Sequence, residues 1–349
     1  MIAIERGLTE WENGIKEFGY SLFLSPKWVE AMADSTCKPI YIDFDENGIV
    51  VAKISGLVID GGWLKGSQLY FYSGPAMRTP DSAMFQDCLK SLWEFAVGCN
   101  YSRISIRPWD QLHSYEPAVK GYNPTSTHEY EIDLLKQYDD KTISSRILRN
   151  VKKARKINAS VQQSTELRYL DLLMSFLDET KSRRVSKFGI EYSPFYLFNL
   201  ERKSIAKLVQ SGLARFYIAM DGEQVQSVLL MIDDGKRAYN LLKGSFHTAY
   251  VNGVSSFADF EVVHHYSLDG HAVFNLGVEL ANQEGEGLNS YKAGMGGEKI
   301  FKHGAYTYYL IYPYKILNLF FYINSSVPDF KWIMAIRRKL SMLFSGAKN

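Results

Sequence analysis

The sequence runs through one order of elements twice, and this repetition constrains the fold more than any other feature. Apolar alternation and helical spacing predict, in the first half, strands at 40–44, 49–54, 69–72 and 103–107, with a helix at 81–97 before the last strand. The second half has the same order, with strands at 215–220, 224–232, 238–242 and 272–276 and a helix at 255–268. Asn47-Gly48 and Asp221-Gly222 predict tight turns in the two opening hairpins. A pattern repeated over about 150 residues predicts duplicated domains, not a solenoid.

The length agrees with two domains, because 349 residues exceed what one ordinary core organises and 46% of them are apolar. Hairpins followed by a strand, a helix and a strand predict an α/β (α+β) class with two tandem domains. Each domain would be a mixed, mostly antiparallel sheet flanked by helices. We place the first domain at 1–145, the second at 146–313 with a basic linking helix at its start, and a C-terminal amphipathic tail at 314–349.

Charge and cysteine usage limit the partners and the compartment. Forty basic against 38 acidic residues leave a net charge of +2, so only local clusters of charge can attract a polyanion. Three cysteines at spacings that fit neither a zinc site nor a disulfide framework predict a reducing compartment, the cytoplasm. The first residues lack the pattern of a secretory signal and no apolar run is long enough to span a bilayer, so we expect any membrane contact to be peripheral.

Several common reaction classes lack their motifs in this chain. The sequence has no Gly-x-Ser-x-Gly elbow, Walker A loop, dinucleotide-binding glycine fingerprint or His-Glu-x-x-His zinc motif. The seven histidines form no metal-ligand pattern, and adjacent His264 and His265 point in different directions on a helix. We therefore expect no metal and no bound cofactor, which leaves a transfer reaction that needs neither.

One segment combines glycines with a single lysine. Residues 287–298 read GLNSYKAGMGGE, and an aromatic run from Tyr306 to Tyr314 follows them. Glycine outside a repeat usually marks a positive φ or a close approach of backbone and ligand, so Lys292 is a candidate for a binding or catalytic cation. The alternative from spacing alone is a flexible loop before a strand, with Lys292 a solvated charge.

The same segment resembles the C-terminal motif of the Fem-type peptidyltransferases, enzymes that add amino acids to peptidoglycan precursors and carry an aromatic-Lys-x-Gly-aromatic-Gly-Gly-Glu string. Tyr291 matches the first aromatic position, and Met295 departs from the second. The family has tandem GNAT-like acyltransferase domains, and the order of elements predicted above is that of a GNAT domain. The resemblance implies that Lys292 stabilises the oxyanion and the leaving hydroxyl, with Tyr291 packed beneath it. It also implies that the backbone approaches the acyl donor at Gly294, Gly296 and Gly297.

A basic helix links the two predicted domains. Six of the eleven residues from 146 to 156 are basic and none is acidic: Arg146, Arg149, Lys152, Lys153, Arg155 and Lys156. Asn150, Lys153, Ala154 and Lys156 resemble the family's Asn-x-x-Lys-Ala-x-Lys-Asn element. One interpretation is a phosphate-contacting surface for tRNA or a pyrophosphate-linked precursor, made by Arg149, Lys152, Lys153 and Lys156. The other is an ordinary solvated helix face.

Two further elements have both a functional and a structural interpretation. Arg183 aligns with the family arginine that contacts the acceptor substrate, and Arg184 is the alternative. A guanidinium suits this task because its fork can bond both oxygens of a carboxylate or phosphate, but either arginine can equally be a cation that ends a helix. Residues 328–344 predict a basic amphipathic helix that lies on an anionic membrane surface or docks on its own domain.

The sequence departs from the family at Arg107, which precedes Pro108 where the family often has an acid, so the family's carboxylate is not expected there. Three hypotheses follow. The first is a cytoplasmic transferase that moves an aminoacyl group from aminoacyl-tRNA to an amino group of a peptidoglycan precursor. The second is an acyl-CoA-dependent N-acyltransferase acting on a sugar or peptide amine in envelope biosynthesis, although residues 243–254 lack the CoA pyrophosphate motif. The third is a non-catalytic binding module derived from such a transferase.

Overall fold

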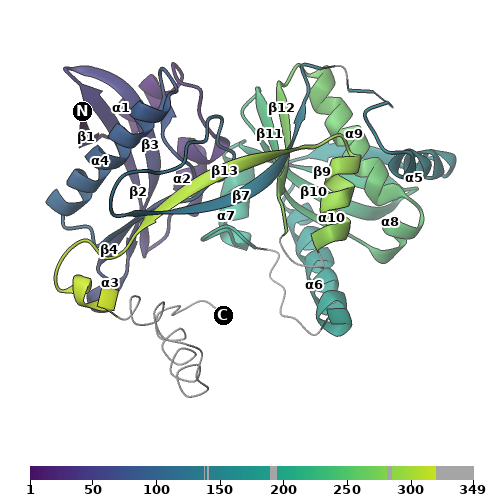
Figure 1. Cartoon of the computed structure of the whole chain (residues 1–349). Coiled ribbons are helices and arrows are strands. Elements are labelled where there is room, and N and C mark those ends of the chain that lie inside the picture. The colour runs from purple at the N-terminus through teal and green to yellow at the C-terminus, as the bar shows by residue number, and fades with distance from the viewer. Residues whose placement is uncertain (137, 140, 189–194, 281–284, 320–349) are drawn as a thin grey trace.

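The computed structural model describes residues 1–136, 138–139, 141–188, 195–280 and 285–319 (Figure 1). Within these ranges the chain forms one sheet of 13 strands in the order β1-β2-β3-β4-β6-β13-β7-β12-β11-β10-β9-β8, with β5 paired to β3. Most neighbouring strands are antiparallel, and the parallel pairs are β4 with β6 and β11 with β12. The predicted class, two like-ordered halves with a mixed and mostly antiparallel sheet flanked by helices, is confirmed.

The bounds of the elements follow the predicted order in both halves. The first half contains β1 (Ile2–Glu5), α1 (Leu8–Ile15), η1 (Leu22–Leu24), α2 (Pro26–Met32), β2 (Cys37–Glu46), β3 (Ile49–Asp60), α3 (Gly62–Lys65), β4 (Ser67–Phe71), β5 (Ala76–Met77), α4 (Ser82–Gly98), β6 (Arg103–Ile106) and β7 (Tyr122–Asp133). The second contains α5 (Ser145–Lys156), β8 (Ser160–Ser164), α6 (Arg168–Phe188), α7 (Arg202–Gln210), β9 (Ala214–Asp221), β10 (Gln224–Asp233), β11 (Arg237–Ser245), α8 (His247–Val251), α9 (Val254–Leu268), β12 (Val273–Val278), α10 (Gly285–Gly294), β13 (Glu298–Thr307) and η2 (Tyr314–Leu317).

Local sequence signals explain where these elements begin and turn. Asn47 and Gly48 have φ of 56° and 84°, so β2 and β3 are joined by the left-handed turn that Asn-Gly favours. Gly222 likewise has a φ of 58° between β9 and β10. The Ser25 side chain accepts a hydrogen bond from the backbone N–H of Trp28 (3.3 Å), and this cap starts α2 immediately before Pro26.

The last strand of the second half is inserted into the first half. β13 lies between β6 and β7 and pairs antiparallel with β7 along all ten of its residues. The other edge of β7 pairs with β12 of the second half. Figure 1 shows β7 and β13 as two long strands, side by side, that cross from the first half to the second. The two halves therefore share their central strands.

One hydrophobic core also runs through both halves. It includes Trp28 and Tyr72 from the first half and Leu200 and Phe216 from the second. Hydrogen bonds cross the same junction: the Tyr72 hydroxyl donates to the carbonyl of Phe198 (2.6 Å). A separate core around α5 and α9 covers the opposite face of the second half. Shared apolar burial of this kind fixes the two halves relative to each other.

The described chain ends just after η2, which lies beside α3 (Figure 1). A Cβ added at Gly66, directly after α3, would lie 2.5 Å from the ring of Tyr314. The predicted amphipathic helix at 328–344 lies outside the described residues. Within the described ranges, no helix has the length and apolar character needed to cross a bilayer.

Candidate active site

A bulge in β12 separates this strand from its parallel neighbour. β11 and β12 pair where residues 237–239 face residues 273–275. Beyond Asn275 the register of β12 against β7 shifts, and Gly277 has a left-handed backbone with a φ of 82°. The Asn275 side chain stabilises this bend by accepting a hydrogen bond from the N–H of Gly277 (2.7 Å). Parallel pairing of β11 with β12 therefore stops at the bulge.

Lys292 of α10 reaches this bulge. A Cβ added at Gly277 would lie 3.6 Å from Nζ of Lys292 and 3.6 Å from the hydroxyl oxygen of Tyr239, so the ammonium and the phenol flank the same backbone position. Nζ donates a hydrogen bond to the carbonyl of Val278 (2.8 Å) and lies 6.0 Å from the centre of the Tyr130 ring.

The environment of Lys292 changes its proton affinity. The residue is 8% exposed, and burial lowers the pKa of its ammonium to about 8, against smaller opposing effects of Glu129 and Asp259. Within the described ranges no carboxylate forms an ion pair with Nζ. Lys292 is therefore a buried cation at neutral pH whose charge is not matched by a direct partner, and its pKa allows proton exchange near neutrality.

The lysine lies on a helix, which corrects the expectation of a glycine-rich loop. The Asn289 side chain ties α10 to the end of β12, accepting from the N–H of Leu280 (3.1 Å) and donating to its carbonyl (2.8 Å). At the other end Gly296 has a φ of 89°, and the N–H of Gly297 donates to the carbonyl of Lys292 (3.1 Å). This is the Schellman arrangement that ends helices, so the glycine pattern marks a helix C-terminus.

The other two glycines of the motif, Gly294 and Gly297, lie against neighbouring residues of the protein. A Cβ at Gly294 would lie 2.9 Å from the hydroxyl of Ser144, at the start of α5, and one at Gly297 would lie 3.0 Å from Leu276. Close packing of α10 against α5 and β12 accounts for both. An approach of Gly294, Gly296 and Gly297 to an acyl donor stays a prediction.

Tyr291 does not pack beneath the lysine as the resemblance implied. Its hydroxyl donates to the carboxylate of Asp259 (2.5 Å), which also pairs with Lys243 (2.5 Å). The reason is helical geometry, since consecutive residues of α10 point about 100° apart. The aromatic ring near the ammonium is Tyr130 of β7, which the motif does not contain.

A buried polar network lies beside Lys292 and joins the two halves. The guanidinium of Arg237 pairs with Asp110 (2.7 Å) and Glu131 (3.5 Å), and Nζ of Lys302 pairs with Glu131 (2.7 Å). Asp110 also accepts from the backbone N–H of Leu22 (3.0 Å). Asp110 lies three residues beyond Arg107, but its oxygens are used by these contacts, so it holds the halves together.

Glu129 is the acid of this network that has neutral partners. It is fully buried and accepts hydrogen bonds from the Tyr239 hydroxyl (3.1 Å), the Asn275 amide (3.1 Å) and the backbone N–H of Asp110 (3.0 Å). Burial first, and then the negative charge of Asp110, raise the pKa of Glu129 to about 7, although Lys302 and the Asn275 bond act the other way. Sequence reasoning did not identify Glu129.

Hydrogen bonds connect Glu129 to the surface. The hydroxyl of Tyr239 bonds to that of Tyr196 at 3.3 Å, and the Tyr196 side chain is partly exposed. We call Glu129, Tyr239 and Tyr196 the proton relay, because each hydroxyl can pass on one proton as it accepts another. The phenol in the middle of the relay, that of Tyr239, flanks Gly277, as does the ammonium of Lys292. The bulge is thus flanked by an ammonium with a pKa of about 8 and by a phenol whose hydrogen-bond acceptor is a carboxyl group with a pKa of about 7.

The predicted basic helix forms as α5. Its apolar side chains Ile147, Val151 and Ala154 are buried against α9, and its basic residues are exposed. Lys153 donates to the carbonyl of Val251 (2.5 Å) and Arg155 pairs with Glu261 (3.1 Å). Arg149, Lys152 and Lys156 form no ion pair within the described part of the chain.

The predicted acceptor-binding arginines lie on α6. The guanidinium of Arg183 lies 5.4 Å from the centre of the Tyr250 ring of α8. The side chain of Arg184 lies outside the described part of the structure. Contact of either arginine with an acceptor stays a prediction.

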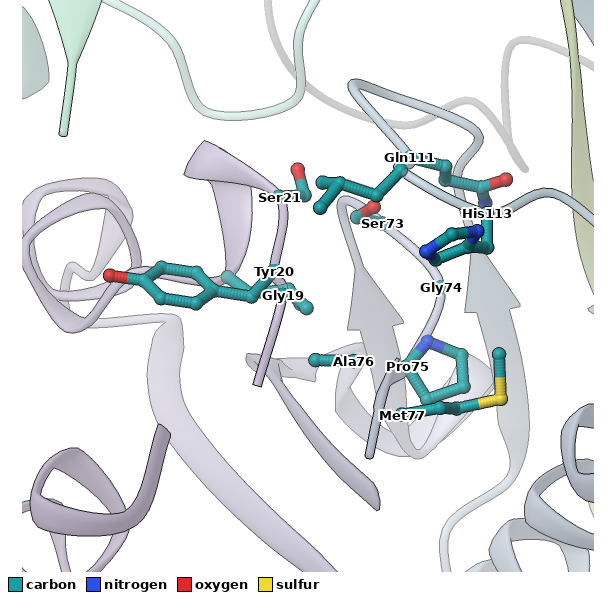
Figure 2. A pocket seen from close by; sticks show the side chains of 12 residues that line it. Gly19, Tyr20, Ser21, Ser73, Gly74, Pro75, Ala76, Met77, Gln111 and His113 are labelled. Atoms are coloured by element: carbon teal, nitrogen blue, oxygen red, sulfur yellow. The ribbon is translucent and has the colours of Figure 1, made fainter. Parts of the chain in front are cut away.

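Two hollows lie elsewhere in the molecule. The first, in the N-terminal half, has a volume of about 10 Å³, room for about one water molecule. Figure 2 shows it between Gly19–Ser21, Ser73–Met77 and Gln111–His113. The second is an open groove between α6 and α7, lined by residues that include the ion pair of Arg202 with Asp171. Neither contains Lys292, and no cluster of three metal-ligating side chains occurs in the described ranges.

No protein-family model matches the chain, and no curated protein matches it by sequence. Solved structures do match. FemX is 13% identical with a TM-score of 0.66, over 91% of this chain and 99% of FemX. L-PGS from Bacillus licheniformis is 14% identical with a TM-score of 0.56, over 88% and 94% of the two chains. A C-terminal domain described as part of a lysylphosphatidylglycerol synthetase from Agrobacterium fabrum is 14% identical with a TM-score of 0.51, over 82% and 89%. These likenesses confirm the fold predicted from the sequence.

Proposed function

We propose that this chain, which has the tandem fold of the Fem-type and GNAT acyltransferases, moves an aminoacyl group from aminoacyl-tRNA to an amino group of a peptidoglycan precursor. The observation that carries the proposal is Lys292, a buried ammonium beside the bulge of β12 with a carbonyl as its hydrogen-bond partner. The likeness to FemX over 91% of the chain supports the same reaction class.

The proposed chemistry uses Lys292 to stabilise charge. The acceptor amine attacks the ester carbonyl of the donor, so a C–N bond forms and the carbonyl oxygen becomes negative. A positive charge in a buried site stabilises this oxygen more strongly than one in water. The C–O bond to the donor then breaks, and Lys292 gives a proton to the leaving oxygen, which its pKa of about 8 permits.

The proton relay keeps the proton count balanced. The attacking nitrogen must lose one proton, and Tyr196 and Tyr239 pass it to the carboxylate of Glu129. Glu129 then releases this proton to solvent along the relay, and Lys292, which has given a proton to the leaving hydroxyl, takes one up from solvent. One proton leaves nitrogen and one reaches oxygen, so no outside acid or base is consumed.

The donor is the part of the proposal that one assay tests directly. Purified protein is incubated with charged tRNA, with acyl-CoA, or with neither, and transfer of label to a lipid-linked or nucleotide-linked muropeptide is measured. We expect transfer from charged tRNA. Transfer from acyl-CoA alone would select the second hypothesis, and no transfer from either donor would favour a binding module.

The basic surface of α5 gives a prediction for tRNA binding. Replacing Arg149 and Lys156 with glutamine should weaken tRNA binding about tenfold and reduce the slope of log affinity against log salt by about two, because each lost phosphate contact removes nearly one released counterion. Filter binding across a salt series measures both quantities. The double variant Lys16→Gln, Lys27→Gln in the first half is the matched control, since both side chains are exposed. Equal slopes for all three proteins would make α5 an ordinary solvated face.

One observation favours the acyl-CoA alternative. β11 and β12 are parallel and part after three paired positions, so a flexible donor arm with its own amide groups could bond to their edges. Under this alternative Lys292 and the proton relay keep their roles, because attack of an amine on a thioester needs the same oxyanion stabilisation and the same proton acceptor.

A further inference from the structure

We propose that the end of the molecule formed by α3 and η2 docks on an anionic membrane surface. Five large apolar side chains are exposed there, and we call them the apolar tip: Trp63, Leu64, Tyr312, Ile316 and Leu319. The inference goes beyond the transfer reaction and does not depend on it, because it concerns where the protein binds and its test measures binding.

The two segments of the apolar tip form one surface. The ring of Tyr314 lies against Gly66, at the end of α3. Ser102, just before β6, holds both segments: its hydroxyl donates to the carbonyl of Lys65 (2.5 Å) and its carbonyl accepts from the N–H of Leu310 (2.7 Å). Figure 1 shows η2 beside α3 at the lower left of the molecule.

The exposure of the tip is not that of scattered surface residues. Trp63 is 85% exposed, the highest value among the large apolar side chains in the described ranges. It lies on a four-residue helix between β3 and β4, so the connection presents a tryptophan and a leucine to solvent. Single exposed apolar residues are common, but a cluster from two distant segments marks an interaction surface.

The charge around the tip favours lipid headgroups as the partner. Asp60 accepts from the N–H of Gly62 at the start of α3 (2.8 Å), but the sequence has no other aspartate or glutamate from 61 to 80 or from 299 to 328. Lys65 and Lys315 supply positive charge, and Nζ of Lys315 lies 5.8 Å from the centre of the Tyr312 ring. Tryptophan and tyrosine prefer the membrane interface, and lysine beside them is attracted to anionic lipid.

The position of the tip in the chain points the same way. The chain continues from Leu319 into the residues for which the sequence predicts a basic amphipathic helix, at 328–344. Both features are typical of peripheral membrane proteins, and stable peripheral binding usually needs two such signals.

The test is vesicle binding by the full chain. We compare the wild type with the double variant Trp63→Ser, Leu64→Ser in flotation with vesicles of phosphatidylglycerol mixed with phosphatidylcholine, and with phosphatidylcholine alone. The expected result is binding to the anionic vesicles and a loss of about tenfold or more in the variant, because two large apolar side chains no longer enter the interface. Leu268→Ser is the matched control, since this leucine is also well exposed but lies at the end of α9.

Each other outcome overturns the proposal. If the wild type binds neither vesicle, the tip has no membrane partner. If the variant binds as well as the wild type, residues outside the tip carry the binding. If sedimentation velocity without vesicles shows self-association that the variant lacks, the tip binds a second copy of the chain. Unchanged thermal unfolding of the variant, expected because both side chains are exposed, excludes misfolding as the cause.

Discussion

Replacing Lys292 with alanine or methionine should lower kcat/KM by about a thousandfold, because the oxyanion loses its buried cation. Methionine is the more informative change, since it keeps the length of the apolar stem and removes only the charge. The measurement is the initial rate of transfer to the muropeptide with the donor selected by the assay above. Lys299→Met on β13 is the matched control, because Lys299 is exposed and pairs with Glu279.

The stability of the Lys292→Met variant separates catalysis from folding. Burial lowers the pKa of Lys292 from 10.5 to about 8. At pH 7 the lysine is charged in the unfolded chain, so keeping the ammonium buried in the folded state lowers the free energy of unfolding. The free energy of unfolding of the variant at pH 7 should therefore be no lower than that of the wild type. Rates within about threefold of the wild type would remove Lys292 from the proposed mechanism.

Replacing Glu129 with glutamine should remove the acidic limb of the pH–rate profile and lower kcat/KM by about a hundredfold at pH 8. In the wild type the relay accepts a proton only when Glu129 is ionised, so the rate should rise through pH 7 and level off above it. It should fall again above about pH 8, where Lys292 loses its charge. A glutamine at 129 can keep one oxygen as acceptor for the Asn275 amide and the N–H of Asp110, with its NH2 group toward the Tyr239 hydroxyl, but it cannot take up the proton.

Two further variants test whether the acidic limb of the pH–rate profile depends on the proton relay. Tyr239→Phe breaks the relay while Glu129 keeps its bonds to Asn275 and Asp110, and it should flatten the same limb. Glu131→Gln removes a neighbouring acid that pairs with Arg237 and Lys302, so it should lower stability and leave the limb near pH 7. If the pH–rate profile of Tyr239→Phe keeps the acidic limb of the wild type, the proton leaves the attacking nitrogen by another route.

Much of the fold could be read from local patterns. The two hairpins and the helices at 81–97 and 255–268 depend on neighbouring residues, and these formed where apolar period and turn chemistry predict. The motif singled out Lys292 as a candidate, yet it could not show that its glycines end a helix. That distinction depends on the packing of α10 against Ser144 and Leu276, which no local pattern encodes.

The proton relay and its network were beyond sequence reasoning because their residues meet only in the folded sheet. Glu129, Tyr239 and Asn275 lie on three different strands, and Asp110 follows a fourth. A faint signal was present: Glu129 and Glu131 alternate with apolar Tyr130 and Ile132, which is typical of a strand with one solvated face. In the folded protein the side chains of Tyr239 and Asn275 and the segment at Asp110 contact Glu129 and bury it, so an apparent surface acid is internal.

The insertion of β13 also affects how the chain can be made. During synthesis β6 and β7 emerge long before the strand that separates them, so the N-terminal sheet has a gap until residue 307 has left the ribosome. Unfilled strand edges are templates for pairing with other chains. The sheet of a nascent chain therefore closes late, and a prematurely terminated product should aggregate because the edges of β6 and β7 that β13 covers stay unpaired.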